Sequence, residues 1–566
     1  MNDLQRILAL YEGGQLAEAE ALGAALAALT PEDGAVWALR GQIALARGLF
    51  QDAADHLQRA RAHAPNDPAL TINLAMALHR NGRHKDALRL LKGVLKRDPS
   101  NASAFLYTGL CRLALADPNA AADALHGALT LRPEWPEALE GFAMLSLALD
   151  RADKALAFAR RALRKEPGRI SALEVAARAS ELLGDYEVAG AYYHQVAGMR
   201  PDPQTVAKLA TALQRMGRHD DAIVAFRHAL KREPGSAALQ HAQGASLLAL
   251  GRLAEGWPLY AKRLVAGLGG ESERAGDRSL SAPPTPGMRV IAWADQGVGE
   301  QLLFASLIPD LVATGAALAV ECDFRLVPVL QRSFPGVTIC AYTEPPDPAL
   351  AGFGDGRFCL SDAAAWFRKD FASFPPHGGY LVSDPGLAAS LRAKYNSGRQ
   401  TGRPLVGISW QRADGSVLSD AKSLPLDRWG PILHVAGCTF VNLQYGDTAA
   451  EIAAVSKATG VKVISDPSVD PLINLDAFAA QVAAMDLVIS TSSTTVHMAG
   501  ALGVPAWTLL PVGVGSLWHW FLDRDDSPWY PGMRLFRQTR RGDWNTVLDA
   551  VSAALVEFVE TWRERR

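Results

Sequence analysis

The sequence lacks a cysteine framework and a long apolar run, and each absence excludes a class of protein. Its five cysteines are odd in number and never stand at CxxC or another metal-ligand spacing: Cys111, Cys322, Cys340, Cys359 and Cys438. We therefore expect neither a disulfide scaffold nor a bound metal, and we interpret the cysteines as reduced core residues. No apolar run is long enough to span a bilayer, and the acidic residues near the N-terminus do not fit a secretory signal. A cytoplasmic protein without membrane insertion is expected.

Charge of one sign is also lacking. The formal net charge is −2 and the pI is about 6.7, and no basic stripe carries interleaved aromatic residues. Proteins that track a phosphate backbone carry such a stripe, so nucleic acid is not expected as a partner. Hydrophobic residues make up 49% and charged residues 20% of the 566 positions, which is typical of a globular protein. Because this length exceeds what one hydrophobic core organises, two or more domains are expected.

Prolines recur with a fixed period through the first half of the chain. The interval is 34 residues five times and then 33, at Pro31, Pro65, Pro99, Pro133, Pro167, Pro201 and Pro234. Alanines keep the same period at Ala53, Ala87, Ala121, Ala155, Ala189 and Ala222. Such a period indicates a stacked supersecondary unit, and the proline closes each unit because it cannot continue a helix.

Residue sizes within each period predict a pair of helices. A small residue recurs on the first helix, where another helix must approach closely, at Gly41, Ala75, Gly109, Ala143, Ala177, Ala210 and Gly244. A bulky residue follows the periodic alanine by four positions on the second helix, at Leu57, Leu91, Leu125, Tyr193, Phe226 and Tyr260. Glycines mark the intervening turns, at Gly48, Gly82, Gly184, Gly217 and Gly251.

This pattern resembles the tetratricopeptide repeat family over about residues 1 to 265. It predicts an α-solenoid, a superhelix of about seven to eight repeats, over residues 1–266. The resemblance implies a concave face that binds a peptide or protein segment. A solenoid that serves only as a dimerisation surface or spacer is the alternative.

Beyond the array, residues 267–286 are rich in Gly, Ser, Pro and charge and are predicted to be a linker. Short apolar runs then alternate with helix-like segments, which favours parallel sheets built from βαβ units. Two such series predict two nucleotide-binding-like lobes, over residues 287–400 and 401–566. The expected strands are 288–293, 316–321 and 336–340 in the first lobe, and 405–410, 439–444, 461–465, 486–490 and 506–510 in the second.

Ligands of open α/β sheets lie beyond the carboxyl ends of the strands, which singles out loops 295–300, 410–422, 444–446 and 491–497. The last of these loops has the layout of a phosphate site. Ser492, Ser493 and Thr494 are predicted to cap a small-residue helix whose positive end faces an anion, with His497 one turn in. An ordinary capped helix with a half-buried histidine is the alternative.

Several motifs occur together and in order: WADQGVGEQLLFASLIP, STSSTTVHMAGALGVPAWTLLP, SPWYPGMRLFRQ and GDW. With them the second half, about residues 287 to 560, resembles the heptosyltransferase-like glycosyltransferases that are fused to tetratricopeptide repeats in bacteria. The resemblance implies a GT-B domain of two Rossmann-like lobes, the first on the acceptor side and the second on the nucleotide-sugar side. In that family a string close to EQGLGD fills the first loop, and its acidic end resembles the general base. Glu300 stands there in this chain, and Asp295 is the second candidate.

The resemblance also implies a donor site. Lys422 is expected to neutralise charge on the leaving phosphate, with Ser423 as a secondary donor. The remaining candidate donor-binding residues are Gln296, Gly297, Gly299, Trp410, Gln411, Gln444, Ser492, Ser493, Thr494 and His497. A solvated lysine and strand-end packing of Trp410, Gln411 and Gln444 are the alternatives. Relatives commonly carry an acidic residue where this chain has Ser492, which puts the donor in question. No metal and no cofactor are expected, since the nucleotide-sugar is a substrate.

A repeat array joined to a sugar-transferase domain resembles the nucleocytoplasmic O-GlcNAc transferases and, more closely, the bacterial tetratricopeptide-linked flagellin glycosyltransferases. The second resemblance implies transfer of a sugar to Ser or Thr of a protein acceptor, flagellin, held by the array. It further implies a nonulosonic acid such as pseudaminic acid, carried on CMP. Two alternatives stay open: a heptosyltransferase-like enzyme acting on a saccharide acceptor, and a non-catalytic adaptor or export chaperone.

Overall fold

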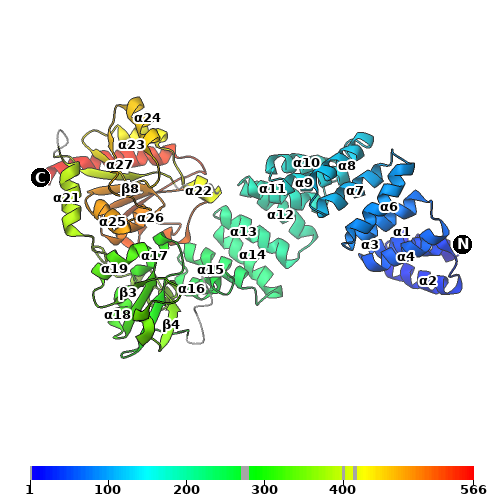
Figure 1. Cartoon of the computed structure of the whole chain (residues 1–566), viewed down its shortest axis with the longest axis horizontal. Helices are drawn as coiled ribbons and strands as arrows, with labels where there is room; N and C mark the ends of the chain where they lie inside the picture. The colour runs from blue at the N-terminus through cyan, green and yellow to red at the C-terminus, as the bar shows by residue number, and fades with distance from the viewer. Residues whose placement is uncertain (1–2, 269–278, 398–401, 412–416, 566) are drawn as a thin grey trace. The chain divides into compact units, whose positions relative to one another are not determined.

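A computed structural model describes residues 3–268, 279–397, 402–411 and 417–565, without the side chains of 417–419. Part of the predicted linker, residues 269–278, lies outside the described residues. Contacts divide the chain into two compact units, Met1–Arg200 and Pro201–Arg566. The helical repeats fill the first unit and continue into the second (Figure 1).

Unit 1 consists of antiparallel helix pairs, as the repeat pattern predicts. In chain order its helices are α1 (Asp3–Glu12), α2 (Leu16–Leu29), α3 (Gly34–Ala46), α4 (Phe50–His63), α5 (Pro68–Arg80), α6 (His84–Arg97), α7 (Ala102–Ala114), α8 (Pro118–Leu131), α9 (Pro136–Ala148), α10 (Ala152–Lys165), α11 (Ile170–Leu182) and α12 (Tyr186–Met199). The first helices α3 and α5 begin at an acidic N-cap, and the Asp67 side chain accepts from two backbone N–H groups of α5. At these two helices the local sequence sets where the helix starts.

The small residues allow the two helices of a pair to touch. A Cβ placed on Gly41 would lie 2.5 Å from Cγ of Leu57, and one on Gly109 would lie 2.6 Å from Cγ of Leu125. The predicted pairing of a small residue with a bulky one is therefore confirmed at these positions. The turns are left-handed at the predicted glycines, with φ of 75° at Gly48. Ala116 adopts the same conformation, with φ of 57°, in a repeat that has no turn glycine.

The repeats of unit 2 continue the same pattern. They comprise α13 (Pro203–Arg215), α14 (His219–Arg232), α15 (Ala237–Ala249) and α16 (Leu253–Tyr260), followed by the 3-10 turn η1 (Ala261–Arg263). The boundary between the units thus falls inside the array, whereas the sequence suggested a division near residue 266. The reason is that α16 shares a hydrophobic cluster with the α/β half through Trp257 and Tyr260.

The α/β half contains two sheets. A four-stranded parallel sheet has the order β3-β2-β1-β4, and a seven-stranded sheet has the order β10-β11-β9-β8-β5-β6-β7. The strands are β1 (Arg289–Trp293), β2 (Ala317–Cys322), β3 (Thr338–Ala341), β4 (Gly356–Cys359), β5 (Leu405–Ser409), β6 (Thr439–Asn442), β7 (Val463–Ile464), β8 (Leu487–Thr491), β9 (Ala506–Leu510), β10 (Asp526–Ser527) and β11 (Tyr530–Arg537). Every predicted strand is confirmed to within two residues, while β4, β10 and β11 were not predicted. Among the strands of the described residues, the β10–β11 pair alone is antiparallel.

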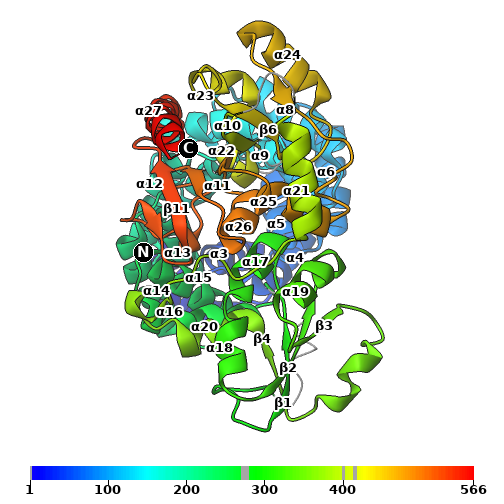
Figure 2. The ribbon, with the colours of Figure 1, turned by 90° about the vertical axis from the view of Figure 1, so that its left-hand side faces the viewer.

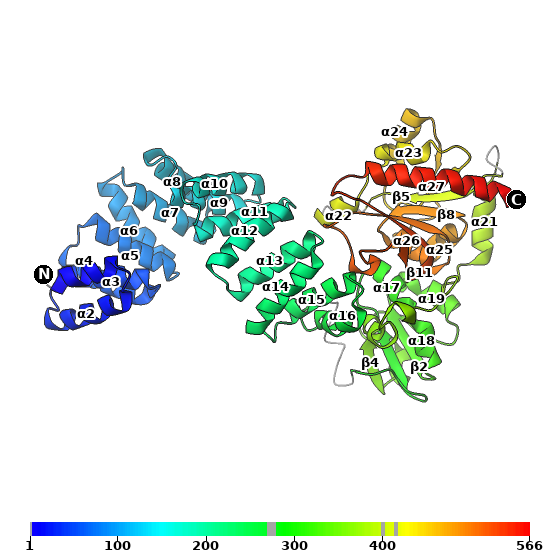
Figure 3. The same ribbon diagram turned by 180° about the vertical axis from the view of Figure 1, so that it is seen from behind.

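Helices cover both faces of the larger sheet. On one face α27 (Asn545–Glu564) packs against alternate residues of β5 and β8, including Val406 and Leu487 (Figure 3). On the other, α25 (Leu475–Ala483) and α26 (Thr494–Ala501) pack against Leu405 and Val488. Successive residues of a strand face opposite sides of the sheet, and helices cover both sides. Both sets of residues are therefore apolar, which gives a continuous apolar run in the sequence.

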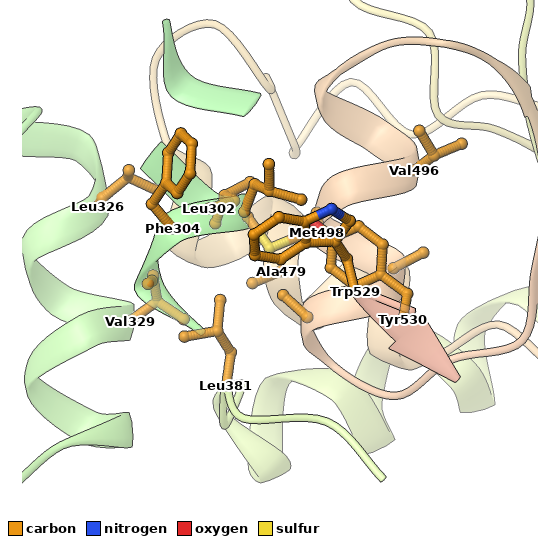
Figure 4. Close-up of a cluster of buried hydrophobic side chains, with 14 of the residues drawn as sticks. Leu302, Phe304, Leu326, Val329, Leu381, Ala479, Val496, Met498, Trp529 and Tyr530 are labelled. Carbon is orange, nitrogen blue, oxygen red and sulfur yellow. The ribbon is translucent and has the colours of Figure 1, made fainter. Parts of the chain in front are cut away.

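The two sheets share one core. The helix after β1 is α17 (Val298–Ala305), which lies beside α26 (Figure 2). Phe304 of α17 meets Trp529 edge to face, with ring centroids 6.0 Å apart (Figure 4). The helix α21 (Pro385–Tyr395) precedes the second strand series but packs on α25. The predicted division at residue 400 therefore falls between the two series of strands, but α21, which precedes it, packs with the second series.

Candidate functional site

A cavity of about 290 Å³ opens where α17 and α26 begin. Both helices follow the carboxyl end of a parallel strand, β1 and β8, which is where open sheets bind ligands. The lining residues are Gly297, Val298, Gly299, Glu300, Arg325, Tyr445, Pro471, Leu472, Leu475, Phe478, Ser492, Ser493, Thr494, Thr495, His497 and Leu517. The structure thus brings loops 295–300 and 491–497 together, as the sequence predicts for a shared site.

Both helices present their N-termini to this cavity without a side-chain cap. Gly297 occupies the N-cap position of α17 and Ser493 that of α26, and neither provides a side-chain cap hydrogen bond. The predicted capping by this serine turn is therefore wrong. Its hydroxyls are used elsewhere: Ser492 accepts from Trp520 Nε1 at 2.9 Å, and Ser493 Oγ lies 3.2 Å from Ser490 Oγ. The first backbone N–H groups and the positive ends of two helices face one space, an arrangement that attracts an anion.

Gly299 lets α17 and α26 approach each other. A Cβ at this position would lie 3.0 Å from Cδ2 of His497. A larger residue would therefore push the two helix N-termini apart. The structure gives Gly299 a packing role in addition to its place in the cavity wall.

His497 is buried and uncharged. Its ring stacks on Trp520, with centroids 5.1 Å apart, and Nδ1 lies 2.9 Å from Oη of Tyr530. Burial, assisted by the nearby charge of Lys422, lowers the pKa of His497 to about 3. At neutral pH the imidazole contributes polar contacts to the site and no positive charge.

Glu300 and Lys422 supply charge to the region. Glu300 lies in the first turn of α17, lines the cavity and carries its carboxylate near Gly297. Lys422 ends the short helix α22 (Val417–Lys422) and is buried, and its charge depresses the pKa values of both His497 and His519 after the larger effect of burial. The lysine therefore lies close to the α26 end of the site. Ser423 is half-buried next to it, and residues 412–416 of the predicted loop lie outside the described residues.

Arg325 is a cavity residue that the sequence reasoning missed. It follows β2 and is held by Asp323 through two hydrogen bonds, Nε to Oδ1 at 2.9 Å and Nη2 to Oδ2 at 2.7 Å. Its Nη1 donates to the carbonyl of Leu472 across the cavity wall. The rule that pointed to the loops after β1 and β8 would also have pointed to this loop, since β2 neighbours β1 in the sheet.

The structure places Asp295 in a buried ionic cluster and not in the cavity wall. Arg263 Nε donates to Asp295 Oδ2 at 2.7 Å, and Ser361 Oγ donates to Oδ1 at 2.9 Å. Arg263 also donates to Asp362 Oδ1 at 2.7 Å. Both Asp295 oxygens therefore serve the junction with the last repeat, which argues against this residue as the base.

Gln296 also faces the last repeat, because its Nε2 donates to Tyr260 Oη at 2.9 Å. Together with the Arg263–Asp295 pair, this contact fixes the loop that leads into α17. Residues of the final repeat thus hold the segment that carries Gly297 and Glu300.

Trp410, Gln411 and Gln444 tie strand ends together. Gln444 Oε1 accepts from the backbone N–H groups of Trp410 and Gln411 at 2.9 and 3.0 Å, and its Nε2 donates to the Gln411 carbonyl. The indole of Trp410 is fully buried and donates to Glu451. These contacts favour the strand-end packing interpretation for Trp410.

Gln444 also lines a second cavity, of about 410 Å³, at the carboxyl ends of β6 and β7. Its other lining residues are Asn442, Gly446, Asp447, Thr448, Ala449, Ser465, Asp466, Pro467, Val469, Asp470, Pro471 and Gln481. Pro471 lines both cavities, so the two are neighbours. Burial alone would raise the pKa of Asp466, but hydrogen bonds from Lys394, Ser468 and Tyr395 outweigh it and lower the pKa to about 2. Carboxylates and amides in this cavity suit a ligand rich in hydroxyl and amine donors.

Comparison with known families identifies the repeats. Residues 4–68 and 207–270 match one tetratricopeptide repeat family and residues 44–106 match another. The N-terminal helical array is therefore a tetratricopeptide-repeat solenoid. A tetratricopeptide repeat protein of known structure from Parabacteroides merdae ATCC 43184 is 17% identical, with a TM-score of 0.34, and the match covers 43% of this chain and 97% of that one.

Two curated proteins are similar in sequence. Protein FlbA of Caulobacter vibrioides is 27% identical over 546 residues, which cover 94% of this chain and 80% of that protein. Cellulose synthase 2 operon protein C of Komagataeibacter xylinus is 33% identical over 156 residues, 27% of this chain and 12% of that protein. The first match extends through the α/β half, so the similarity is not confined to the repeats. In the described part of the chain, no helix is long and apolar enough to cross a membrane.

Proposed function

We propose that this protein is a glycosyltransferase that moves a sugar from a nucleotide-sugar donor to a protein acceptor, with flagellin as the first acceptor to test. The observation that carries the proposal is the pair of uncapped helix N-termini at one cavity, beside the buried Lys422. Transfer from a nucleotide-sugar builds negative charge on a phosphate as it leaves. Fixed N–H dipoles and a lysine are groups that stabilise such charge.

The reaction assigns a role to Glu300. An acceptor hydroxyl attacks the anomeric carbon while its proton passes to the Glu300 carboxylate. The bond between that carbon and the phosphate oxygen breaks, and both bonding electrons leave with the phosphate. The N–H groups at the start of α26 and the Lys422 ammonium receive this charge, and neutral His497 supports the helix end.

The second cavity is the proposed place for the nucleoside. With the phosphate at α26, a nucleoside lies toward Pro471, which both cavities share. Asp447 and Asp470 are suited to accept hydrogen bonds from ribose hydroxyls, and the Gln481 side chain is suited to contact the base. The carboxylates that line this cavity would repel a phosphate, so the cavity favours the uncharged nucleoside over a second phosphate.

A groove in unit 1 supports a protein acceptor. A cavity of about 510 Å³ has an apolar floor that includes Phe142 and Phe158, whose rings stack with centroids 5.1 Å apart. Arg151, Lys154 and Arg161 complete its wall. An extended segment with an apolar side chain next to an acidic one fits this chemistry, and solenoids of this type present such surfaces.

Intact-mass analysis of flagellin co-expressed with this protein and a nonulosonic-acid pathway tests the proposal. We expect flagellin to gain a sugar-sized mass increment. The fraction of flagellin that carries this increment should fall at least a hundredfold in Glu300→Gln and in Lys422→Ala. Lys369→Ala, an exposed lysine, is the matched control and should retain full transfer. Nucleotide binding separates the roles, because Glu300→Gln should still bind the donor whereas Lys422→Ala should bind it more weakly.

Other outcomes redirect the assignment. Full transfer by both variants would show that the site residues are wrong. Flagellin binding without nucleotide binding or a mass increment would favour a non-catalytic adaptor. Transfer to a saccharide but to no protein would favour the heptosyltransferase-like alternative.

A further inference from the structure

Two histidines and a cysteine from neighbouring repeats of unit 1 converge on one point. His79 lies near the end of α5, His84 begins α6, and Cys111 lies in α7. Nδ1 of His79 is 3.2 Å from Nδ1 of His84 and 3.5 Å from Sγ of Cys111. The three candidate ligand atoms all lie within 4.8 Å of one another.

Two of these separations match those of a zinc coordination shell. With Zn–N bonds of about 2.0–2.1 Å and Zn–S bonds of about 2.3 Å, a tetrahedral angle separates two nitrogens by about 3.3 Å and a nitrogen from a sulfur by about 3.6 Å. The corresponding separations at His79 are 3.2 and 3.5 Å. The third pair, His84 and Cys111, lies within the 4.8 Å limit of the cluster, so an ion bound by all three needs at most a small side-chain adjustment.

Hydrogen bonding accounts for the cluster only in part. The Nδ1 atom of neutral His79 has either one proton or one lone pair, so it cannot pair well with both neighbours at once. A metal ion takes the imidazoles as neutral ligands and the cysteine as its thiolate, so binding displaces the thiol proton of Cys111.

The three positions differ from those of the two adjacent repeats. One period before and after, the residues that correspond to His79, His84 and Cys111 are Leu45 and Leu113, Phe50 and Pro118, and Ala77 and Leu145. All six of these residues are apolar. Three ligating side chains occur together only at the junction of α5, α6 and α7 among these neighbours.

We propose that His79, His84 and Cys111 bind a thiophilic transition-metal ion, with Zn²⁺ as the expected ion and water as the fourth ligand. Imidazole and thiolate ligands select this class of metal over Mg²⁺ or Ca²⁺. Both histidines are half-buried, which leaves the ion a path from solvent. The ion joins α5, α6 and α7 and so fixes the junction of two successive repeats, independently of any activity in the α/β half.

Metal titration of the full-length protein, without a histidine tag and freed of metal by a chelator, tests the proposal. We expect one Zn²⁺ or Co²⁺ per chain with micromolar or tighter affinity, and a thiolate-to-cobalt charge-transfer band in the Co²⁺ complex. His84→Ala and Cys111→Ser should each weaken binding at least tenfold and remove the rise in melting temperature that Zn²⁺ gives the parent protein.

The seventh repeat offers a matched control. His219 begins α14 as His84 begins α6, but Gln214 and Ser246 stand where the ligating partners would be and hydrogen-bond to each other at 2.8 Å. His219→Ala should therefore leave metal binding unchanged. If Cys111→Ser fails to fold, His84→Ala decides, since its side chain lies at a helix start. Absence of micromolar binding, or binding that both variants retain, overturns the proposal.

Discussion

The repeats of unit 1 and the final repeat in unit 2 share one period but differ in what surrounds them. In unit 1 each helix pair contacts its neighbours in the stack. The final pair, α15 and α16, is built into the α/β core: Trp257 Nε1 donates to the Arg368 carbonyl at 2.7 Å and its ring meets Trp518 edge to face. Arg263 lies beyond it with only 2% of its side-chain surface exposed. The same hairpin therefore serves as a stacking unit or as part of a domain core, according to the residues on its outer face.

The largest expected effect tests the final repeat, which is buried against the α/β half. Arg263→Met leaves Asp295 and Asp362 in a buried site without their cation. Loss of one partner from a buried ion pair costs about 3–5 kcal/mol, so hydrogen exchange should show unit 2 strongly destabilised and unit 1 unchanged. Arg218→Met, which breaks an exposed pair with Asp221, is the control and should cost about 1 kcal/mol or less. Equal loss in both units would break the comparison.

Helix contacts within unit 1 give the next effect. Gly41→Ala places a Cβ 2.5 Å from Leu57 Cγ and should cost about 1–3 kcal/mol by overpacking. Gly93→Ala should instead stabilise by about 0.5–1 kcal/mol, because nothing lies within 4 Å of its added Cβ and alanine favours the helix. Urea unfolding measures the free energy of unfolding of both variants. If the two substitutions changed it in the same direction, the predicted role of the Gly41 contact would be contradicted.

A glycine at a close contact between two helices also occurs in unit 2. Substitution there should affect the affinity for the nucleotide-sugar more than the stability of the fold. Gly299→Ala places a Cβ 3.0 Å from His497 Cδ2 and forces α17 away from α26. We expect nucleotide-sugar affinity to fall about tenfold, equivalent to about 1.4 kcal/mol. Gly336→Ala, with open space around its added Cβ, is the control. Unchanged affinity in Gly299→Ala would mean that the spacing of the two helix ends is not critical.

The smallest expected effect is the dependence of stability on pH just below neutrality. The folded-state pKa of His497 is about 3, below its ordinary value of 6.5. The unfolded chain therefore binds a proton that the folded chain does not, and stability present above pH 6.5 is lost as the pH falls toward 3. The loss is about 1 kcal/mol between pH 7 and pH 5.5 and steepens to about 1.4 kcal/mol per pH unit at lower pH. Urea midpoints at several pH values should show a shallower loss for His497→Gln, while exposed His434→Gln should match the parent.

The sequence predicted the repeats and most strands because each depends on a local or periodic pattern. β4 reads GRFC, β10 reads DS, and β11 contains Pro531 and Gly532, so none gives a clear apolar strand signal. The equally short β7 was predicted because its residues lie in an apolar run. Turn glycines marked most of the turns. At Ala116, one period after Gly82, the repeat alone marks the turn, and its left-handed conformation carries no residue signal of its own.

The candidate site was predictable only where it depends on strand ends. Glu300 and Ser493 reach one cavity because each lies just beyond a parallel strand. The burial of Asp295 depends on Arg263, which comes from the repeat array and carries no mark of that pairing in the local sequence. The cluster at Cys111 escaped for a similar reason, since its partners lie in the preceding repeat and not at a short motif spacing.

The position of the boundary between the units determines how this protein could be recombined. A chimera that exchanges the repeats for another array would ordinarily be joined where the repeat motif ends, near residue 266. That joint would replace Trp257, Tyr260 and Arg263, and with them the support of the loop before α17. A joint between Arg200 and Pro201 keeps these residues with the α/β half. The exchangeable cassette is therefore shorter than the repeat array.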